Sequence, residues 1–376
     1  MNLAWTEIRR AKLRFGLLTG AVALLVFLIM FMQTLSGTLL NLFIGGVENQ
    51  SAGVLVYGED ARRSIEGSIV TPDQVAAVAT VEGVGNAAPL GENTFTVRPA
   101  GQTELEDATL FGYELGGPGS PTTLSDGRLP TADGEAVASS NSGDGYAIGD
   151  VVTVLPGDYE IEIVGIATNA AFNVQPTLYA SYATYEEALK LQNPDATAVL
   201  PTLVAVEPEP GVEPVTLSTR ITEEVEGVEA LDLDTAVASL PGVASITQSF
   251  SIVLALAFFV IVLVTGFFFL ILTVQKLQAL TLLRAVGAST GYLLRALLVQ
   301  VVLVTVSGVA IAGVLLAVVA SGSSEDFRFD ADPTLILGVG GAVLVLAMIA
   351  SLASVRRVAR LDPAAATQRM AGGGLA

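Results

Sequence analysis

The stretch FGLLTGAVALLVFLIMFMQTLSGTLLNLFI, residues 15–44, decides the fold, because it contains no charged side chain. As a helix it would extend about 45 Å, whereas a bilayer has a hydrocarbon core of about 30 Å that about 20 residues cross. We therefore predict a membrane span that tilts or continues outward as a stalk. The run is too long for the apolar region of a cleaved signal peptide.

Three further apolar runs, at 250–274, 293–319 and 334–355, are long enough to cross a bilayer. A polar segment at 45–249 separates the first run from the second and is large enough to fold with its own core. The predicted fold class is thus a membrane protein with an α-helical bundle of four spans and an extracytoplasmic α+β domain.

The charges indicate how the chain is oriented. Basic residues cluster before the first span, around the loop 275–292 and in the tail 356–376, and such short basic flanks stay in the cytoplasm. The segment 45–249 and the loop 320–333 are then extracellular, and together they hold all but two of the 37 acidic residues. A net charge of −19 argues against a nucleic-acid partner and is most simply a solubility feature of the exterior.

The segment 1–14 places alanine and isoleucine at helical spacing among basic residues, and Phe15 continues the spacing. This pattern predicts a cytoplasmic amphipathic helix in the membrane interface, although a plain basic flank explains it equally well.

The exterior segment is expected to contain two parts. An αβ subdomain at about 51–116 and 200–240 is indicated by two helix–turn–strand patterns, each with the phrase VEGV before its strand. The first helix has a capping box, in which Thr71 is the cap and Gln74 its partner. Between them, residues of about 117–200 are rich in Gly, Pro and Ser and include the alternating DYEIEIVGI, which predicts an inserted β-subdomain.

Several kinds of chemistry are excluded or disfavoured. The chain has no histidine and no cysteine, so the usual general base and the usual metal ligands are missing. No P-loop is present, because none of the lysines follows a glycine. The spans carry no charge near their middle, which disfavours an ion-coupled transporter. The chain itself is therefore not expected to be an enzyme.

The loop QKLQALTLLRAVGASTGYLLRALLVQ, residues 275–300, resembles the cytoplasmic loop of MacB/FtsX-type permeases of ABC transporters. The order of one span, a large exterior domain and three spans is similar to that family as well. So is the stretch DGRLPTADGEAVAS at 126–139. The loop lacks the acidic residue that family members often carry before the turn.

The resemblance implies two copies of a partner ATPase that holds ATP and Mg²⁺, a homodimer of the permease, and ATP-driven motion passed outward by mechanotransmission. The side chains expected to couple to the ATPase are Lys276, Thr281, Arg284, Gly287 and Ala288.

Within the family, TEIRRAKLRFGLLTG at 6–20 and GGVENQSAGVLVYG at 45–58 most resemble the haem-exporter type of Gram-positive bacteria. Haem would then be the cargo rather than a cofactor, and a carboxylate is an anionic oxygen ligand for ferric iron comparable to tyrosinate. The residues expected to bind it are Glu48 as iron ligand, with Phe43, Leu40, Leu39, Phe31, Phe250 and Tyr57 around it.

Alternatives remain at this stage. Glu48 is equally read as a solvated carboxylate where the helix leaves the lipid. The protein would then transmit a signal or activate a cell-wall hydrolase without transport, or export a lipid, a peptide or an antibiotic.

Overall fold

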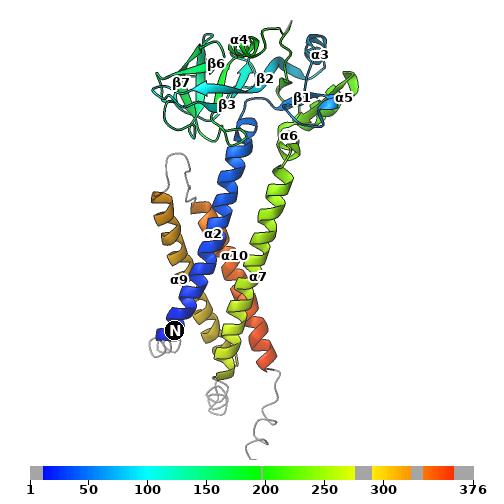
Figure 1. The fold of residues 1–376 in the computed structure, drawn as a ribbon. Coiled ribbons are helices and arrows are strands. Elements are labelled where there is room, and N and C mark those ends of the chain that lie inside the picture. The colour runs from blue at the N-terminus through cyan, green and yellow to red at the C-terminus, as the bar shows by residue number, and fades with distance from the viewer. Residues whose placement is uncertain (1–11, 196–197, 276–289, 323–332, 360–376) are drawn as a thin grey trace, which may run out of the picture. The chain divides into compact units, whose positions relative to one another are not determined.

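The structure is a computed structural model that describes residues 12–195, 198–275, 290–322 and 333–359. The chain forms two compact units (Figure 1). A helical unit contains the described residues up to Ser36 and from Ser249 onward, and an α/β unit contains those from Gly37 to Gln248.

Within the described residues, four long helices make up the helical unit, although the end of α2 and the start of α7 belong to the α/β unit. They are α2 (Lys12–Glu48), α7 (Val243–Gln275), α9 (Thr290–Ser321) and α10 (Pro333–Ala359). The first three are long and apolar enough to cross a membrane. In α10 the apolar stretch within the described residues is Ile336–Ala350, which is shorter, so a fourth span stays a prediction.

Small residues bring these helices together. A Cβ atom on Gly308 of α9 would lie 2.8 Å from Val22 of α2, and one on Gly340 of α10 would lie 2.8 Å from Val309 of α9. Glycines at such positions permit close backbone approach between membrane helices. The core between the helices is apolar and includes Val26 and Ile29, which are fully buried.

The α/β unit contains one ten-stranded sheet. Its strands are β1 (Val54–Gly58), β2 (Val84–Arg98), β3 (Glu106–Tyr113), β4 (Leu124–Gly127), β5 (Glu135–Ser139), β6 (Val151–Leu155), β7 (Tyr159–Ala167), β8 (Thr177–Ser181), β9 (Leu203–Pro208) and β10 (Val228–Asp232). The helical elements of this unit are η1 (Glu59–Ala61), α3 (Pro72–Val78), α4 (Tyr182–Gln192), α5 (Pro214–Glu224) and α6 (Leu233–Ser239).

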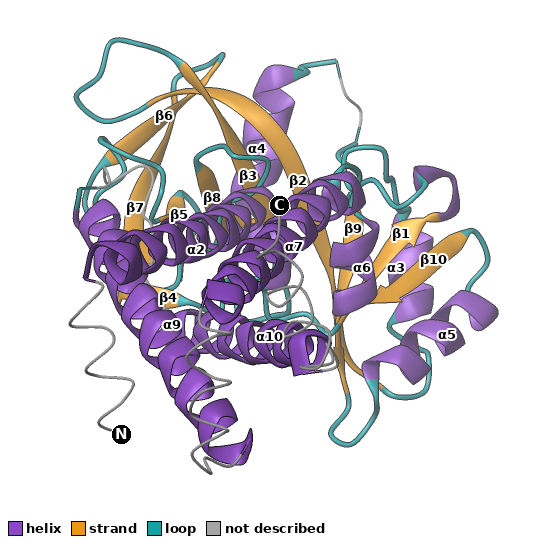
Figure 2. Ribbon diagram, turned by 90° about the horizontal axis from the view of Figure 1, so that it is seen from below, coloured by secondary structure: helices purple, strands orange, loops and turns teal. Residues whose placement is uncertain are grey.

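The strand order β10-β1-β9-β2 interleaves two βαβ units, β1-α3-β2 and β9-α5-β10. All three pairings between these neighbours are antiparallel. This is the split βαβ topology of ferredoxin-like sheets. The expected pair of αβ units therefore forms one interleaved sheet (Figure 2).

Local sequence signals explain where these helices begin and end. The Thr71 side chain accepts a hydrogen bond from the backbone of Gln74, and the Gln74 side chain accepts one from Thr71, which confirms the predicted capping box. The two VEGV phrases form the turns that follow α3 and α5, and their glycines, Gly83 and Gly227, have φ angles of +96° and +78°. Only glycine adopts such angles without strain.

The sheet is covered on both faces. In β1, Val54 and Val56 belong to the core under α3 and α5, whereas Leu55 and Tyr57 belong to the core on the opposite face. That second core also contains the C-terminal end of α2 and residues of α6. Buried residues on both faces explain why β1 reads as a continuous apolar run.

The two expected subdomains share strands instead of forming separate bodies. β2 is 15 residues long, pairing with β9 over its first part and with β3 and β6 further along. β3 falls within the expected αβ segment 51–116, but it pairs in parallel with β8 and contributes Leu110 to the core of the β-rich part.

Other predicted segments lie outside the described residues, wholly or largely. These are most of the amphipathic helix 1–14, the coupling loop 275–292 with its five coupling residues, the loop 320–333 and most of the tail 356–376.

Candidate functional site

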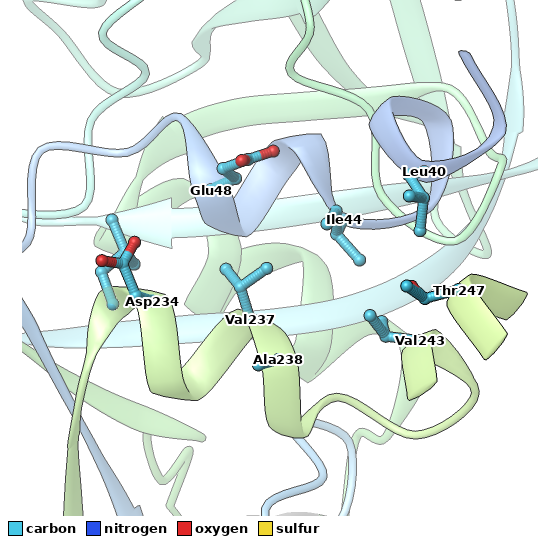
Figure 3. Close-up of a pocket in the computed structure, with 9 residues that line it drawn as sticks. Leu40, Ile44, Glu48, Asp234, Val237, Ala238, Val243 and Thr247 are labelled. Atoms are coloured by element: carbon cyan, nitrogen blue, oxygen red, sulfur yellow. The ribbon is translucent and has the colours of Figure 1, made fainter. Parts of the chain in front are cut away.

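A groove of about 310 Å³ lies between the C-terminal end of α2 and the pair formed by α6 and the start of α7, entirely within the α/β unit (Figure 3). It is lined by Leu40, Ile44, Glu48, Leu233, Asp234, Val237, Ala238, Val243 and Thr247. Small-molecule sites are typically concave and mostly apolar, with few polar groups, and this groove fits that description at the lower end of the usual size range.

The first wall is one face of α2. Leu40, Ile44 and Glu48 recur every four residues, so they lie above one another on the same side of the helix. The wall is thus apolar along its length and ends in a carboxylate. Glu48 is exposed, whereas Val47 beside it is fully buried in the core.

The second wall comes from α6 and α7. The Asp232 side chain caps α6 by accepting a hydrogen bond of 3.1 Å from the Thr235 backbone. After α6 the chain turns at Gly242, where φ is +92°, and α7 begins at Val243. Val237 of α6 and Val243 of α7 bring apolar side chains to the groove.

The charge of the groove is negative. Glu48 and Asp234 contribute its two carboxylates (Figure 3), and no basic side chain lines it among the residues that the structure describes. Arg63 is not part of the lining, and its guanidinium forms an ion pair with Glu229 at 2.6 Å. The groove therefore favours a ligand that brings positive charge to an otherwise apolar body.

Of the residues predicted to bind substrate, only some line the groove. Glu48 and Leu40 line the groove. Phe43 packs against the core and lies 3.6 Å from the position of a Cβ on Gly242, and Leu39 is half-buried on α2 outside the lining. The remaining aromatic side chains, Phe31 and Phe250, belong to the helical unit.

Tyr57 is not accessible from solvent. Its side chain is fully buried in the core of the α/β unit, and its hydroxyl has no hydrogen-bond partner within the described part of the chain. Burial, followed by the charges of Glu229 and Glu66, raises the pKa of this tyrosine well above its ordinary value. As placed, Tyr57 is a core residue, and tyrosinate chemistry at this position is strongly disfavoured.

The sequence interpretation missed α6. The segment LDTAVAS is short and follows a strand directly, and its available signal is the aspartate before it, a preferred helix cap. Because α6 supplies the Asp234 and Val237 side of the groove, the site has a wall that the expected residues did not include.

The polar side chains in the lining, Glu48, Asp234 and Thr247, would offer a metal centre oxygen ligands. No group of three or more acidic side chains that could hold a metal ion occurs among the described residues. A single carboxylate such as Glu48 suits an iron whose other positions are already filled by a macrocycle.

Comparison with known proteins defines the class. Residues 251–363 match the family of FtsX-like permease C-terminal domains. An uncharacterized ABC transporter permease of Mycobacterium tuberculosis (strain CDC 1551 / Oshkosh) is 29% identical over 323 residues, which cover 85% of each chain. Residues 251–363 therefore form an FtsX-like permease C-terminal domain, and the chain as a whole is similar to ABC transporter permeases.

A more distant relative spans nearly the whole chain. It is the "Putative hemin transport system permease protein HrtB" of Staphylococcus haemolyticus (strain JCSC1435), 22% identical over 96% of this chain and 98% of its own. Among solved structures, the periplasmic region of MacB from Actinobacillus actinomycetemcomitans aligns with 49% of this chain and 92% of its own, at 13% identity and a TM-score of 0.36.

Proposed function

We propose that the protein is the permease subunit of an efflux system that uses ATP hydrolysed by a separate subunit to expel haem from the membrane. The observation that carries this proposal is the groove, in which an exposed carboxylate, Glu48, stands at the end of an apolar wall. The relative named as a hemin transport permease, which covers almost the entire chain, supports the same substrate.

The groove's chemistry matches a flat amphipathic macrocycle with a ferric centre. Ferric haem accepts anionic oxygen ligands, and Glu48 provides one at the rim. The apolar side chains of Leu40, Ile44 and Val237 provide a surface for the ring. Because the groove is small and open, we propose that each copy of a two-fold homodimer supplies half of the site.

The docking surface for the ATPase is assigned to the cytoplasmic loop. Permeases of this class act with an ATPase partner, and we propose two copies of it docking on Lys276, Thr281, Arg284, Gly287 and Ala288. Motion would pass outward through the helices to the extracytoplasmic domain by mechanotransmission. A Gly287→Trp variant should keep its membrane insertion and lose the coupling between ATPase and transport, and retained coupling would contradict the docking assignment.

A second candidate substrate is a cationic peptide or antibiotic. The lining contains two carboxylates, Glu48 and Asp234, and no basic side chain among the described residues, which favours a cationic ligand. The two candidates differ in what Asp234 does, because haem needs one iron ligand, whereas an extended cation benefits from both carboxylates.

The deciding experiment is a haem titration of the permease–ATPase complex in detergent. Wild type should shift the Soret band of haem, Glu48→Ala should abolish the shift, and the matched control Asp234→Asn should keep it. No shift in wild type would overturn the haem proposal. Loss of binding in both variants, with a cationic peptide as the better competitor, would favour the second candidate.

A further inference from the structure

The part of α2 that carries Glu48 is attached to the sheet through its backbone. The connection between β7 and β8 contains residues 169–174, here called the 169–174 loop. The N–H groups of Asn173 and Val174 donate hydrogen bonds of 3.1 and 2.9 Å to the carbonyl oxygens of Phe43 and Leu42 on α2. Helix carbonyls of the penultimate turn are thus bound by a loop that belongs to the α/β unit.

Two glycines let this loop approach so closely. The N–H of Gly46 donates a hydrogen bond of 2.7 Å to the carbonyl oxygen of Ala171. A Cβ atom on Gly45 would clash with the carbonyl oxygen of Asn169, and one on Gly46 would lie 2.7 Å from the hydroxyl oxygen of Tyr179. Any larger residue at either position therefore forces the helix and the loop apart.

The tyrosine closes the contact from the sheet side. The Tyr179 hydroxyl is fully buried on β8 and lies 2.7 Å from the carbonyl oxygen of Ala170 and 3.3 Å from that of Gly46, so it donates to both loop and helix. Its ring stacks on Phe111, with centroids 5.4 Å apart. The hydroxyl is held in place by packing within the core.

The residue after Glu48 is fixed as well. The side-chain amide of Asn49 donates to the carbonyl oxygens of Gly45 at 3.2 Å and Asn169 at 2.8 Å. The backbone carbonyl oxygen of Asn49 accepts hydrogen bonds of 2.9 Å from both the N–H and the hydroxyl of Thr122. Glu48 therefore stands between two backbone attachments while its own side chain remains exposed.

We propose that the 169–174 loop, together with Gly45, Gly46, Asn49 and Tyr179, is a positioning site that holds the Glu48 carboxylate in one place on the rim of the groove. Partners that orient a ligand side chain determine how well it binds its metal. The inference rests on the proposed function only in its choice of haem as substrate. The attachment of the helix turn itself is testable without substrate.

The substrate-free test is amide hydrogen exchange on the full chain with its ATPase, read in peptides that cover residues 42–49. Gly46→Ala should accelerate exchange there by about tenfold, because it separates the helix from the loop. Gly37→Ala is the matched control, since it lies on the same helix with open space around it, and should leave exchange unchanged. Equal exchange in both variants would overturn the positioning site.

A double variant protects the test against simple misfolding. Tyr179→Phe removes the oxygen that a Cβ at position 46 would meet, together with that oxygen's own hydrogen bonds. Gly46→Ala should therefore accelerate exchange less in the Tyr179→Phe background than in wild type, and an equal acceleration in both backgrounds would contradict the assigned contact.

The substrate test is haem affinity with the same variants. Gly46→Ala should weaken haem binding by about 10- to 100-fold while the Soret maximum of the bound form stays as in wild type, because the ligand atom is unchanged. Unchanged affinity together with faster exchange would overturn the role in positioning. If Glu48→Ala also leaves haem binding intact, the proposed role of Glu48 as iron ligand fails, whereas the exchange result still decides the attachment.

Discussion

The two walls of the groove are held in different ways. The α2 wall is an uninterrupted helix whose last turns are bound by hydrogen bonds to the 169–174 loop. The α6–α7 wall contains a turn at Gly242 and is held mainly by buried apolar residues such as Leu240 and Val243. Hydrogen bonds are directional, whereas apolar burial is not. The carboxylate is thus on the fixed wall, and the wall opposite is the one able to adjust to a ligand.

The largest expected effect concerns pH, because the sheet behind the fixed wall contains a buried acid. Glu92 of β2 is 3% exposed, and its carboxylate oxygens have no hydrogen-bond partner among the described residues. Burial, and then the charge of Glu66, raises the pKa of Glu92 to about 8. Glu66 in turn accepts a hydrogen bond of 3.0 Å from Asn173 of the 169–174 loop.

The direction follows from proton linkage. The folded state keeps the proton on Glu92 up to about pH 8, whereas the unfolded chain releases it near the ordinary value of 4.5. The contribution of Glu92 to stability is therefore largest below pH 4.5 and falls as the pH rises to about 8, by at most about 5 kcal/mol. Thermal unfolding across this range should show the loss in wild type and a flatter profile in Glu92→Gln. The exposed Glu207→Gln serves as control, and an equally steep profile in Glu92→Gln would contradict the assignment.

A glycine on each wall sharpens the comparison. Gly45→Ala should destabilise the chain by about 3 kcal/mol, because the new methyl group meets backbone that cannot rotate away. Gly242→Ala should cost about 1–2 kcal/mol, which is the strain of a positive φ angle, since its Cβ position is 3.6 Å from the nearest atom of Phe43. Denaturant unfolding measures both, and a larger loss at Gly242 would reverse our view of which wall is fixed.

The smallest expected effect is loss of the cap on α6. Asp232→Ala removes the hydrogen bond to Thr235 and should cost about 1 kcal/mol. Because only the α6–α7 wall is loosened, hydrogen exchange should increase in residues 233–239 and remain unchanged in 42–49. Faster exchange in both segments would show that the walls are coupled rather than independent.

Local patterns in the sequence were sufficient for much of the fold. The uncharged run at 15–44 predicted α2, and Thr71 with Gln74 predicted the start of α3, because such signals act over a few residues. The VEGV phrases likewise located two turns at glycines with positive φ. Each of these features is decided by neighbours along the chain.

Features that depend on distant pairing were not predictable in this way. The shared strand β2 and the β3–β8 pairing join segments far apart in sequence, and a period-two pattern does not name its partner strand. The same holds for the site. Glu48 and Leu40 were expected from the family resemblance and from their place at the end of the first apolar run, but the α6 wall and the 169–174 loop reach them only through the folded sheet.

The most direct test of the proposed function is haem-stimulated ATPase activity of the permease–ATPase complex in lipid nanodiscs. Haem should raise the activity of wild type and of Asp234→Asn, and it should fail to raise that of Glu48→Gln, whose basal activity remains. This variant keeps the size of the side chain and removes the charge that we propose binds ferric iron. Equal stimulation in Glu48→Gln and wild type would contradict the claim that Glu48 at the rim of this groove binds the substrate.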